Sequence, residues 1–263
     1  MKAKRIVIKV GTSTLTYENG KLNLKRVESL CRVICDLNNS GKEVVLVSSG
    51  AIGVGVGKLG MKSRPNETKL KQALAAVGQC ELMFMYDKFF GEYNQNIAQI
   101  LLTKYVLDHK STKNNVINTF NTIIDMGIIP IVNENDTVSV DELDGIHFGD
   151  NDTLSAIVAK LVSADLLIIL TDVDGLYDED PRKNPNANKI SEVKEINEEI
   201  KRIAEGTGSN RGTGGMQTKI SAAEIAIDAG IDCCIMSGDS PDDLYKLFEE
   251  DRPGTIFRAN KEK

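Results

Sequence analysis

Six short runs of nearly continuous apolar residues recur along this chain, separated by longer segments of mixed polarity. A strand with one face in solvent alternates apolar and polar residues, whereas a strand buried on both faces is apolar throughout, as in parallel sheets. The run LLIILT at 166–171 is an example of the second kind. The runs predict buried parallel strands at 5–10, 43–49, 96–102, 128–133, 166–171 and 232–236.

The segments between these runs carry apolar residues at helical spacing, as at Leu70, Leu74, Val77 and Leu82. Alternating strands and helices predict an α/β protein, and the expected fold class is a three-layer α/β/α sandwich with a mostly parallel central sheet. A further strand-like run, TIFRA at 255–259, comes last, and we expect a single domain. The predicted helices cover 24–39, 67–90, 111–126, 152–162 and 216–229.

The composition is that of an ordinary globular protein. The chain has 263 residues, of which 41% are apolar and 27% are charged. A chain of this size buries roughly 70–75% of its unfolded surface around one core or two closely joined lobes. No run of about 18 apolar residues is present, and the opening MKAKRIVIKV enters a strand without a cleavage-site pattern. We therefore expect a cytoplasmic protein with no membrane span and no secretory signal.

Charge and cysteine content narrow the possible functions. The formal net charge of −6 argues against an extended nucleic-acid surface, so a few placed lysines must hold any anionic substrate. The cysteines are odd in number and form no C-x-x-C pair, which argues against a disulfide framework or a zinc site. The five are Cys31, Cys35, Cys80, Cys233 and Cys234; we expect Cys31 and Cys35, which share a helix face, to be plain thiols in the core or near the surface.

Two motifs directly follow the first two predicted strands. Lys9 ends the first strand before Gly11-Thr12-Ser13, so its ammonium can project over the sheet edge while N–H groups of the turn bind phosphate oxygens. The alternative is a surface lysine at a strand end. In Ser48-Ser49-Gly50, small residues let the backbone approach a ligand, and the hydroxyls can donate to a carboxylate. Taken alone, this run is also typical of a tight strand-to-helix turn.

The stretch 55–60 matches G-x-G-x-x-G formally, but it begins several residues after the strand and is a weak signal. It is no Walker loop, because Leu59 stands where Ser or Thr should follow Lys58. Dinucleotide binding is therefore an outlying alternative.

Polar residues are dense around the end of the fourth strand. Asn133-Glu134-Asn135-Asp136-Thr137 ends that strand, and Gly149-Asp150-Asn151-Asp152 precedes a helix. These residues suit an amino-acid zwitterion, with Asp136 placed for the ammonium and the amides for a carboxylate. Two alternatives stay open: Asp150 or Asp152 as a helix cap, and a divalent-metal site, although in phosphoryl transfer the nucleotide often holds the metal.

Two further motifs suit a nucleotide. Thr171-Asp172 leaves the fifth strand, and GTGGMQTK at 212–219 opens the last long helix. A lysine is mildly unfavourable at a helix N-terminus because of the helix dipole, so Lys219 indicates a facing anion; the alternative is a glycine loop with an exposed lysine. The polar, proline-containing stretch 177–189 predicts a loop, which we expect to be a mobile flap.

All of these motifs follow a predicted strand or open a helix, so they should converge beyond the carboxyl ends of the strands, where α/β sheets bind ligands. Groups for phosphate and for carboxylate at one edge favour an enzyme that transfers a phosphoryl group over a binding module.

Together these residues resemble the amino acid kinase family, and within it the glutamate 5-kinases (γ-glutamyl kinases). The resemblance covers almost the whole chain, from IVIKVGTSTLT at 6–16 to the closing GTIF. The nucleotide motifs are shared with members that act on other acceptors, whereas VSSGAIGVG with NENDTVS and GDND points to glutamate. The resemblance implies the amino acid kinase fold in one domain over 1–263, with an acceptor-binding lobe at about 1–160 and a nucleotide-binding lobe at about 161–263.

The resemblance also implies a role for each candidate residue. Ser49, Asp136 and Asn151 would hold L-glutamate. Lys9 and Lys219 would flank the transferred phosphoryl group, and Asp152 would orient both lysines. The residues implied to contact ATP are Lys9, Gly11, Thr171, Asp172, Thr213, Gly214, Gly215, Met216, Gln217, Thr218 and Lys219.

The implied reaction converts L-glutamate and ATP into L-glutamyl 5-phosphate and ADP, the first step of proline biosynthesis. Mg²⁺ would be carried by ATP and not by a protein metal site. The resemblance further implies a homo-oligomer and a downstream glutamyl phosphate reductase that captures the labile acyl phosphate. Many glutamate 5-kinases carry a C-terminal domain of PUA type, and this sequence resembles a short form without it.

The chemistry agrees with this resemblance on one point. A glutamate side chain has a pKa of about 4.3, so its carboxylate is already an ionised nucleophile and needs no general base. We therefore expect structural roles for the two histidines, His109 and His147. The remaining alternatives are another acceptor (N-acetylglutamate, aspartate, carbamate or UMP), a non-catalytic nucleotide or oxyanion-binding protein, and a dinucleotide oxidoreductase.

Overall fold

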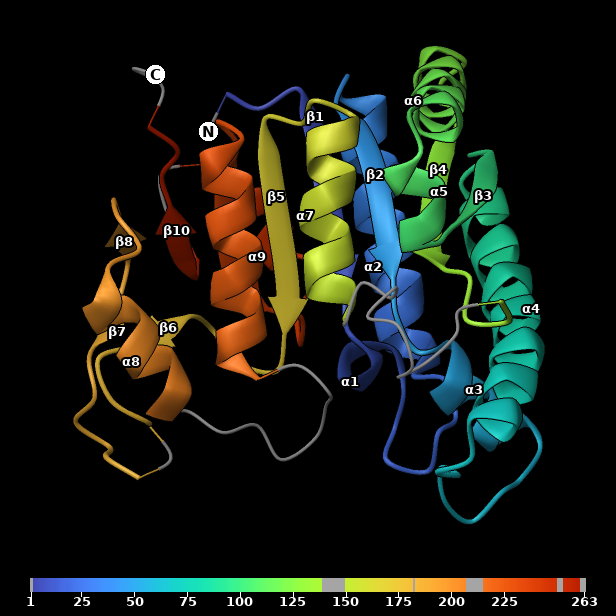
Figure 1. Cartoon of the computed structure of the whole chain (residues 1–263), viewed down its shortest axis with the longest axis horizontal. Helices are drawn as coiled ribbons and strands as arrows, with labels where there is room; N and C mark the ends of the chain where they lie inside the picture. Colours follow the sequence, from blue (N-terminus) through green and yellow to red (C-terminus); the bar gives the residue numbers. More distant parts are fainter. Residues whose placement is uncertain (1, 139–149, 182, 207–214, 250–252, 261–263) are drawn as a thin grey trace.

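A computed structural model describes residues 2–138, 150–181, 183–206, 215–249 and 253–260. Its centre is an eight-stranded sheet in the order β3-β4-β2-β1-β5-β9-β10-β8 (Figure 1). Neighbouring strands are parallel except β9 and β10, which pair antiparallel. The strands of this sheet are β1 (Arg5–Val10), β2 (Glu43–Ser48), β3 (Ile97–Leu102), β4 (Ile129–Glu134), β5 (Leu166–Thr171), β8 (Glu192–Val193), β9 (Asp232–Ser237) and β10 (Thr255–Phe257).

Helices cover both faces of the sheet, and a two-stranded ribbon of β6 (Leu176–Tyr177) and β7 (Lys189–Ile190) lies at one end of the molecule (Figure 1). The helices are α1 (Thr12–Leu15), α2 (Leu24–Asn39), α3 (Ala51–Lys58), α4 (Thr68–Glu92), α5 (Lys104–Asp108), α6 (Lys110–Asp125), α7 (Asn151–Leu161), α8 (Glu198–Gly206), α9 (Met216–Asp228) and α10 (Asp243–Lys246).

The alternation of side chains along β1 separates the core into two layers. Ile6 and Ile8 point into a buried cluster with α2, α3 and α4, whereas Val7 points into a second cluster with α6, α7 and α9. All three side chains are fully buried, and burying an aliphatic side chain of this size contributes about 1.5–3 kcal/mol. The structure is therefore a three-layer α/β/α sandwich, which confirms the predicted fold class.

The predicted strands and helices are present, with ends that differ from the structure by at most two residues. The last predicted run, 255–259, forms a strand only as far as Phe257. The sequence analysis missed the short elements and two longer helices, α3 and α8. The stretch 177–189, predicted as a loop, runs between β6 and β7, and its mobility stays a prediction.

The turn from β2 into α3 depends on glycine. Gly50 has φ = 97°, a left-handed conformation that costs a residue with a side chain about 1 kcal/mol or more. Directly after this turn, the start of α3 lies against α4 with almost no side chain between them, because a Cβ at Gly78 would collide with the carbonyl oxygen of Ala51. Gly78 thus holds the middle of α4 close to the end of β2.

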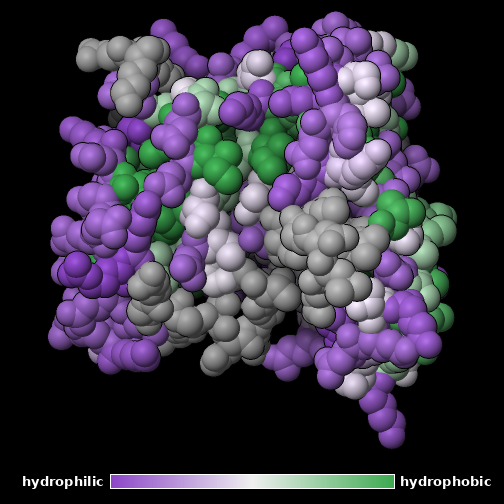
Figure 2. Space-filling view, in the orientation of Figure 1, coloured by the Kyte–Doolittle hydropathy of each residue, from purple (hydrophilic) through white to green (hydrophobic). Residues whose placement is uncertain are grey.

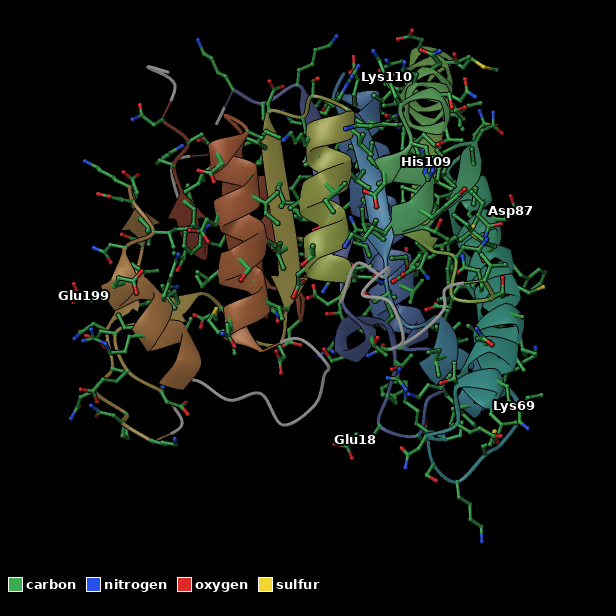
Figure 3. All side chains as sticks on the ribbon, viewed as in Figure 1. Glu18, Lys69, Asp87, His109, Lys110 and Glu199 are labelled. Atoms are coloured by element: carbon green, nitrogen blue, oxygen red, sulfur yellow. The ribbon has the colours of Figure 1, made fainter. Side chains whose placement is uncertain are left out.

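Cys31 and Cys35 match their predicted role, and the contacts of His109 fit a structural one. Cys31, Cys35, Cys233 and Cys234 are buried free thiols, and Cys80 is an exposed one. Burial raises the pKa of Cys35 to about 11, so this thiol stays protonated. His109 lies where α5 meets α6 (Figure 3), and its ring packs against the ring of Tyr105. Its Nδ1 forms a hydrogen bond with the backbone carbonyl oxygen of Tyr105. His147 lies outside the described residues.

The face formed by α6 to α9 is mostly hydrophilic, with apolar residues showing over α7 and α9 (Figure 2). In the described part of the chain, no helix combines the length and the apolar character needed to cross a membrane.

Candidate active site

The carboxyl end of β1 and the first turns of α7 and α9 meet on the same side of the sheet. Lys9 is the penultimate residue of β1, and it shares the face of Val7, against which α7 and α9 pack. The N-terminal ends of both helices carry partial positive charge and unpaired N–H groups, which favour an anion. Lys9 therefore enters a region where two helix ends already attract negative charge.

Asp152 lies in the first turn of α7 and joins two lysines. Its Oδ1 is 2.6 Å from the Nζ of Lys9, and its Oδ2 is 3.1 Å from the Nζ of Lys219, in the first turn of α9. Thr218 also donates to Oδ2 at 2.9 Å. The side chain of Lys9 is 8% exposed, that of Asp152 2% and that of Lys219 7%. We call Lys9, Asp152 and Lys219 the lysine–aspartate cluster.

The lysine–aspartate cluster carries one net positive charge. Burial raises the pKa of Asp152, but the ammonium groups of Lys9 and Lys219 outweigh this effect and hold the pKa below its usual value. Asp152 is thus ionised and balances one of the two lysines. Two buried ammonium groups share one carboxylate, so the cluster with its two helix ends favours binding of an anion such as a phosphoryl group.

Asp150 and Asp152 have different roles although they are two residues apart. Asp150 is the N-cap of α7 and accepts a hydrogen bond from the N–H of Thr153 at 2.9 Å. The capping alternative is therefore correct for Asp150. It is wrong for Asp152, whose carboxylate points at the lysines instead of at the helix end.

Asn151, the first residue of α7, joins the ends of two strands. Its Nδ2 donates to the Oγ of Ser49 at 2.9 Å, to the carbonyl oxygen of Ser48 at 3.2 Å and to the Oδ1 of Asn133 at 3.0 Å. Asn133 in turn donates from Nδ2 to the Oε1 of Gln79 on α4 at 2.9 Å. We call Ser49, Asn151, Asn133 and Gln79 the amide chain.

The structure brings Ser49 and Asn151 together, as the sequence analysis expected. Asp136 is half-buried in the turn after β4, three residues beyond Asn133, and its approach to the same ligand stays a prediction. Because Asn151 and Asp152 are neighbours in one helical turn, the amide chain and the lysine–aspartate cluster lie side by side.

Several expected ATP residues lie around the cluster. Gly11 lies beside the ammonium of Lys9, because a Cβ added there would be 3.6 Å from its Nζ. Thr171 ends β5 and donates to the carboxylate of Asp172, which is exposed. Gly215 is the N-cap of α9, Met216 packs into the core and Gln217 is exposed. Thr213 and Gly214 lie outside the described residues.

The comparison with family models decides the family. The model described as "Amino acid kinase family" matches residues 4–237. This chain belongs to the amino acid kinase family.

Close relatives of this amino acid kinase carry the name Glutamate 5-kinase. The protein of that name from Clostridium perfringens is 59% identical over 260 residues, which cover 98% of this chain and 97% of the relative. The one from Listeria innocua is 52% identical over 261 residues, which cover 99% of this chain and 95% of the relative.

Solved structures of more distant proteins share the fold. Carbamate kinase from Giardia lamblia bound to AMP-PNP has a TM-score of 0.68 at 17% identity and covers 98% of this chain and 99% of its own. Isopentenyl phosphate kinase from T. acidophilum has a TM-score of 0.66 at 16% identity and covers 97% of this chain and 100% of its own. At these identities the likeness establishes the amino acid kinase fold alone.

The acidic side chains of the site bear on whether the protein itself could hold Mg²⁺. Among the described residues, no group of three His, Cys, Asp or Glu side chains is arranged to hold a metal ion. The buried carboxylate of Asp152 is engaged by two lysines and Thr218.

Sequence reasoning did not single out Asn133 or Gln79. Asn133 lies within the quoted polar run, but nothing distinguished it from its neighbours. Gln79 is one polar residue within a long helix and carries no sequence signal. Only the packing of α4 against α3, with the hydrogen bond from Asn133, shows that it joins the amide chain.

Proposed function

We propose that this amino acid kinase transfers the γ-phosphoryl group of ATP to the γ-carboxylate of L-glutamate, yielding L-glutamyl 5-phosphate and ADP, the first step of proline biosynthesis. The observation that carries this proposal is the adjacency of the buried, net-positive lysine–aspartate cluster to the amide chain. The lysine–aspartate cluster suits a phosphoryl group, and the amide chain suits an amino acid. The kinship with proteins named Glutamate 5-kinase supports the same acceptor.

The reaction requires two anions to meet in line, and Lys9 and Lys219 would reduce their repulsion. At an effective dielectric constant near 20, an opposite unit charge at about 4 Å contributes on the order of 4 kcal/mol. Asp152 would hold both ammonium groups in position before the substrates bind, so little reorganisation is needed during transfer. The γ-carboxylate is already ionised and attacks without a general base.

The acceptor would lie between the amide chain and the turn after β4. Ser49 and Asn151 would contact the amino acid, and the carboxylate of Asp136 would pair with its ammonium. This division of roles predicts that a change at any of the three raises the KM for glutamate more than the KM for ATP.

ATP would approach from the β5 and α9 side, where Gly11, Thr171, Asp172 and the run 213–219 are candidates. Mg²⁺ would enter with the nucleotide and neutralise part of the phosphate charge. Backbone N–H groups at the start of α9 are suited to phosphate oxygens. In this arrangement 1–160 forms the acceptor lobe and 161–263 the nucleotide lobe.

Three further assignments belong to the same proposal. The protein acts in the cytoplasm as a homo-oligomer. Its acyl phosphate product is labile, so a reductase that captures it promptly is the expected downstream partner.

An acceptor panel tests the proposal. The purified chain is incubated with ATP, Mg²⁺ and hydroxylamine, and L-glutamate is compared with N-acetylglutamate, aspartate, carbamate and UMP. Formation of γ-glutamyl hydroxamate with glutamate alone is the expected result, because hydroxylamine traps the acyl phosphate. ATP consumption with another acceptor would reject glutamate while retaining the kinase. No turnover with any acceptor would reject the enzymatic function.

A further inference from the structure

Gln79 is held close to the acceptor side of the site by helix packing. It follows Gly78, the residue at which α4 has no room for a side chain against the carbonyl oxygen of Ala51. From there its Oε1 reaches the Nδ2 of Asn133 at 2.9 Å. A helix on the outer layer of the sandwich therefore contacts the carboxyl end of β4.

Two backbone groups determine how the side-chain amides of Asn133 and Asn151 are oriented. The N–H of Glu134 can only donate, and it lies 2.9 Å from the Oδ1 of Asn133. The carbonyl oxygen of Ser48 can only accept, and it lies 3.2 Å from the Nδ2 of Asn151. The orientation of both side-chain amides thus follows from unambiguous partners and does not depend on an arbitrary choice between N and O.

This orientation leaves Asn133 with a donor that requires an acceptor. Asn133 is 2% exposed, and its Oδ1 already accepts from Glu134 and Asn151, so its Nδ2 points away from them toward Gln79. A buried donor without a partner costs stability, so the Nδ2 of Asn133 requires the acceptor that Gln79 supplies. Gln79 therefore holds Asn133 in place, in the orientation that the N–H of Glu134 sets.

The order of donors and acceptors also determines the role of the Ser49 hydroxyl. The two Nδ2 protons of Asn151 serve Asn133, Ser48 and Ser49, so Asn151 offers a ligand its Oδ1, an acceptor. Because the Oγ of Ser49 accepts from Asn151, the hydroxyl proton of Ser49 is directed elsewhere. A serine O–H in that state is a donor, which suits a carboxylate oxygen.

We propose that Gln79 is a positioning residue for the acceptor: by accepting from Asn133 it holds the amide chain in the arrangement in which Ser49 presents a hydroxyl donor to a substrate carboxylate and Asn151 presents an oxygen. This proposal rests on the proposed function, in which the acceptor is an amino acid with a carboxylate and an ammonium. Gln79 itself touches neither substrate.

Two isosteric variants separate this role from a merely structural one. Gln79→Met keeps the length of the side chain and removes the acceptor, whereas Gln79→Glu keeps an oxygen acceptor for Asn133. We expect Gln79→Met to raise the KM for glutamate about tenfold, the loss typical of one hydrogen bond to a charged group, with kcat and the KM for ATP within about twofold. Gln79→Glu should restore the KM for glutamate to within about twofold of the unsubstituted enzyme.

The hydroxamate assay distinguishes the possible failures. Unsubstituted enzyme that turns over glutamate, together with Gln79→Met of unchanged KM, would overturn the role of Gln79 alone. Equal increases in both KM values, or a Gln79→Glu variant as poor as Gln79→Met, would do the same. Absence of glutamate turnover in the unsubstituted enzyme would overturn the proposed function and this inference with it. If Gln79→Met does not fold, Gln79→Lys replaces it, since its ammonium cannot accept from Asn133 and reaches solvent from this half-buried position.

Discussion

The lysine–aspartate cluster and the amide chain begin at adjacent residues of α7, yet different forces hold them. Asp152 joins Lys9 and Lys219 by charge. Two ammonium groups and one carboxylate give these buried residues a net charge of plus one. Asn151 joins Ser49 and Asn133 by hydrogen bonds between neutral groups. Charge attracts an anion from any direction, whereas hydrogen bonds distinguish donors from acceptors. The first group therefore suits stabilising a transferred phosphoryl group, and the second suits selecting which molecule receives it.

The largest effect should follow from removing a charge of the cluster. We expect Lys219→Ala to lower kcat about a thousandfold, because it removes a cation aimed at the transferring group. The melting temperature should stay close to that of the unsubstituted chain. The control is Lys160→Ala, at the exposed end of α7, which should leave kcat unchanged. An unaltered kcat in Lys219→Ala would remove this lysine from the mechanism.

A charge change at Asp152 should affect stability in a pH-dependent manner. We expect Asp152→Asn to lose roughly 3 kcal/mol of unfolding free energy at pH 7, because two buried ammonium groups lose their counter-charge. The native-state pKa of Asp152 is below its unfolded value of about 3.9, so its stabilising contribution is present above that pH and is lost as pH falls through the native pKa. Urea denaturation between pH 7 and pH 3 should show that the difference in unfolding free energy between the unsubstituted chain and Asp152→Asn becomes smaller toward pH 3. A constant gap would show that the ionisation of Asp152 is not responsible.

On the acceptor side, the charged residue should have the larger effect. We expect Asp136→Ala to raise the KM for glutamate about thirtyfold while changing the KM for ATP little, since a pair between the carboxylate and the ammonium of the substrate is lost. Asp136→Asn should be similarly impaired, because the charge is lost in both variants. Equal increases in the two KM values would indicate a general structural role and would weaken the contrast between the two sides.

The smallest effect should come from a neutral hydroxyl. We expect Ser49→Ala to raise the KM for glutamate about tenfold with kcat nearly unchanged. Ser48→Ala is the matched control, because the hydroxyl of Ser48 lies 2.9 Å from that of buried Tyr86 and faces the core. The control should lower the unfolding free energy by about 1 kcal/mol and leave the KM for glutamate as it was. The reverse pattern would place the donor at Ser48.

The larger elements were predictable because their signals are local. An unbroken apolar run such as LLIILT is compatible with a doubly buried strand, and helical spacing marked α2 to the residue. The segment that forms α3, AIGVGVGK, was missed because its glycines disfavour a helix, and packing against α4 overrides that preference. The two-residue strand β8 was missed because it exists only through pairing with β10, about sixty residues later.

The sequence by itself determined the sandwich, the positions of Lys9, Asp152 and Lys219 next to strand ends or helix starts, and the family, since all of these depend on residue types at short spacing. The tertiary structure alone decided that Asp152 bridges both lysines while Asp150 caps a helix, and that Gln79 reaches the acceptor side. Residues separated by 67 positions, as Asp152 and Lys219 are, meet only when the sheet and helices are packed. Residue types at short spacing can be read along the chain. The direction of a hydrogen bond and the balance of buried charge depend on which groups the fold brings into contact.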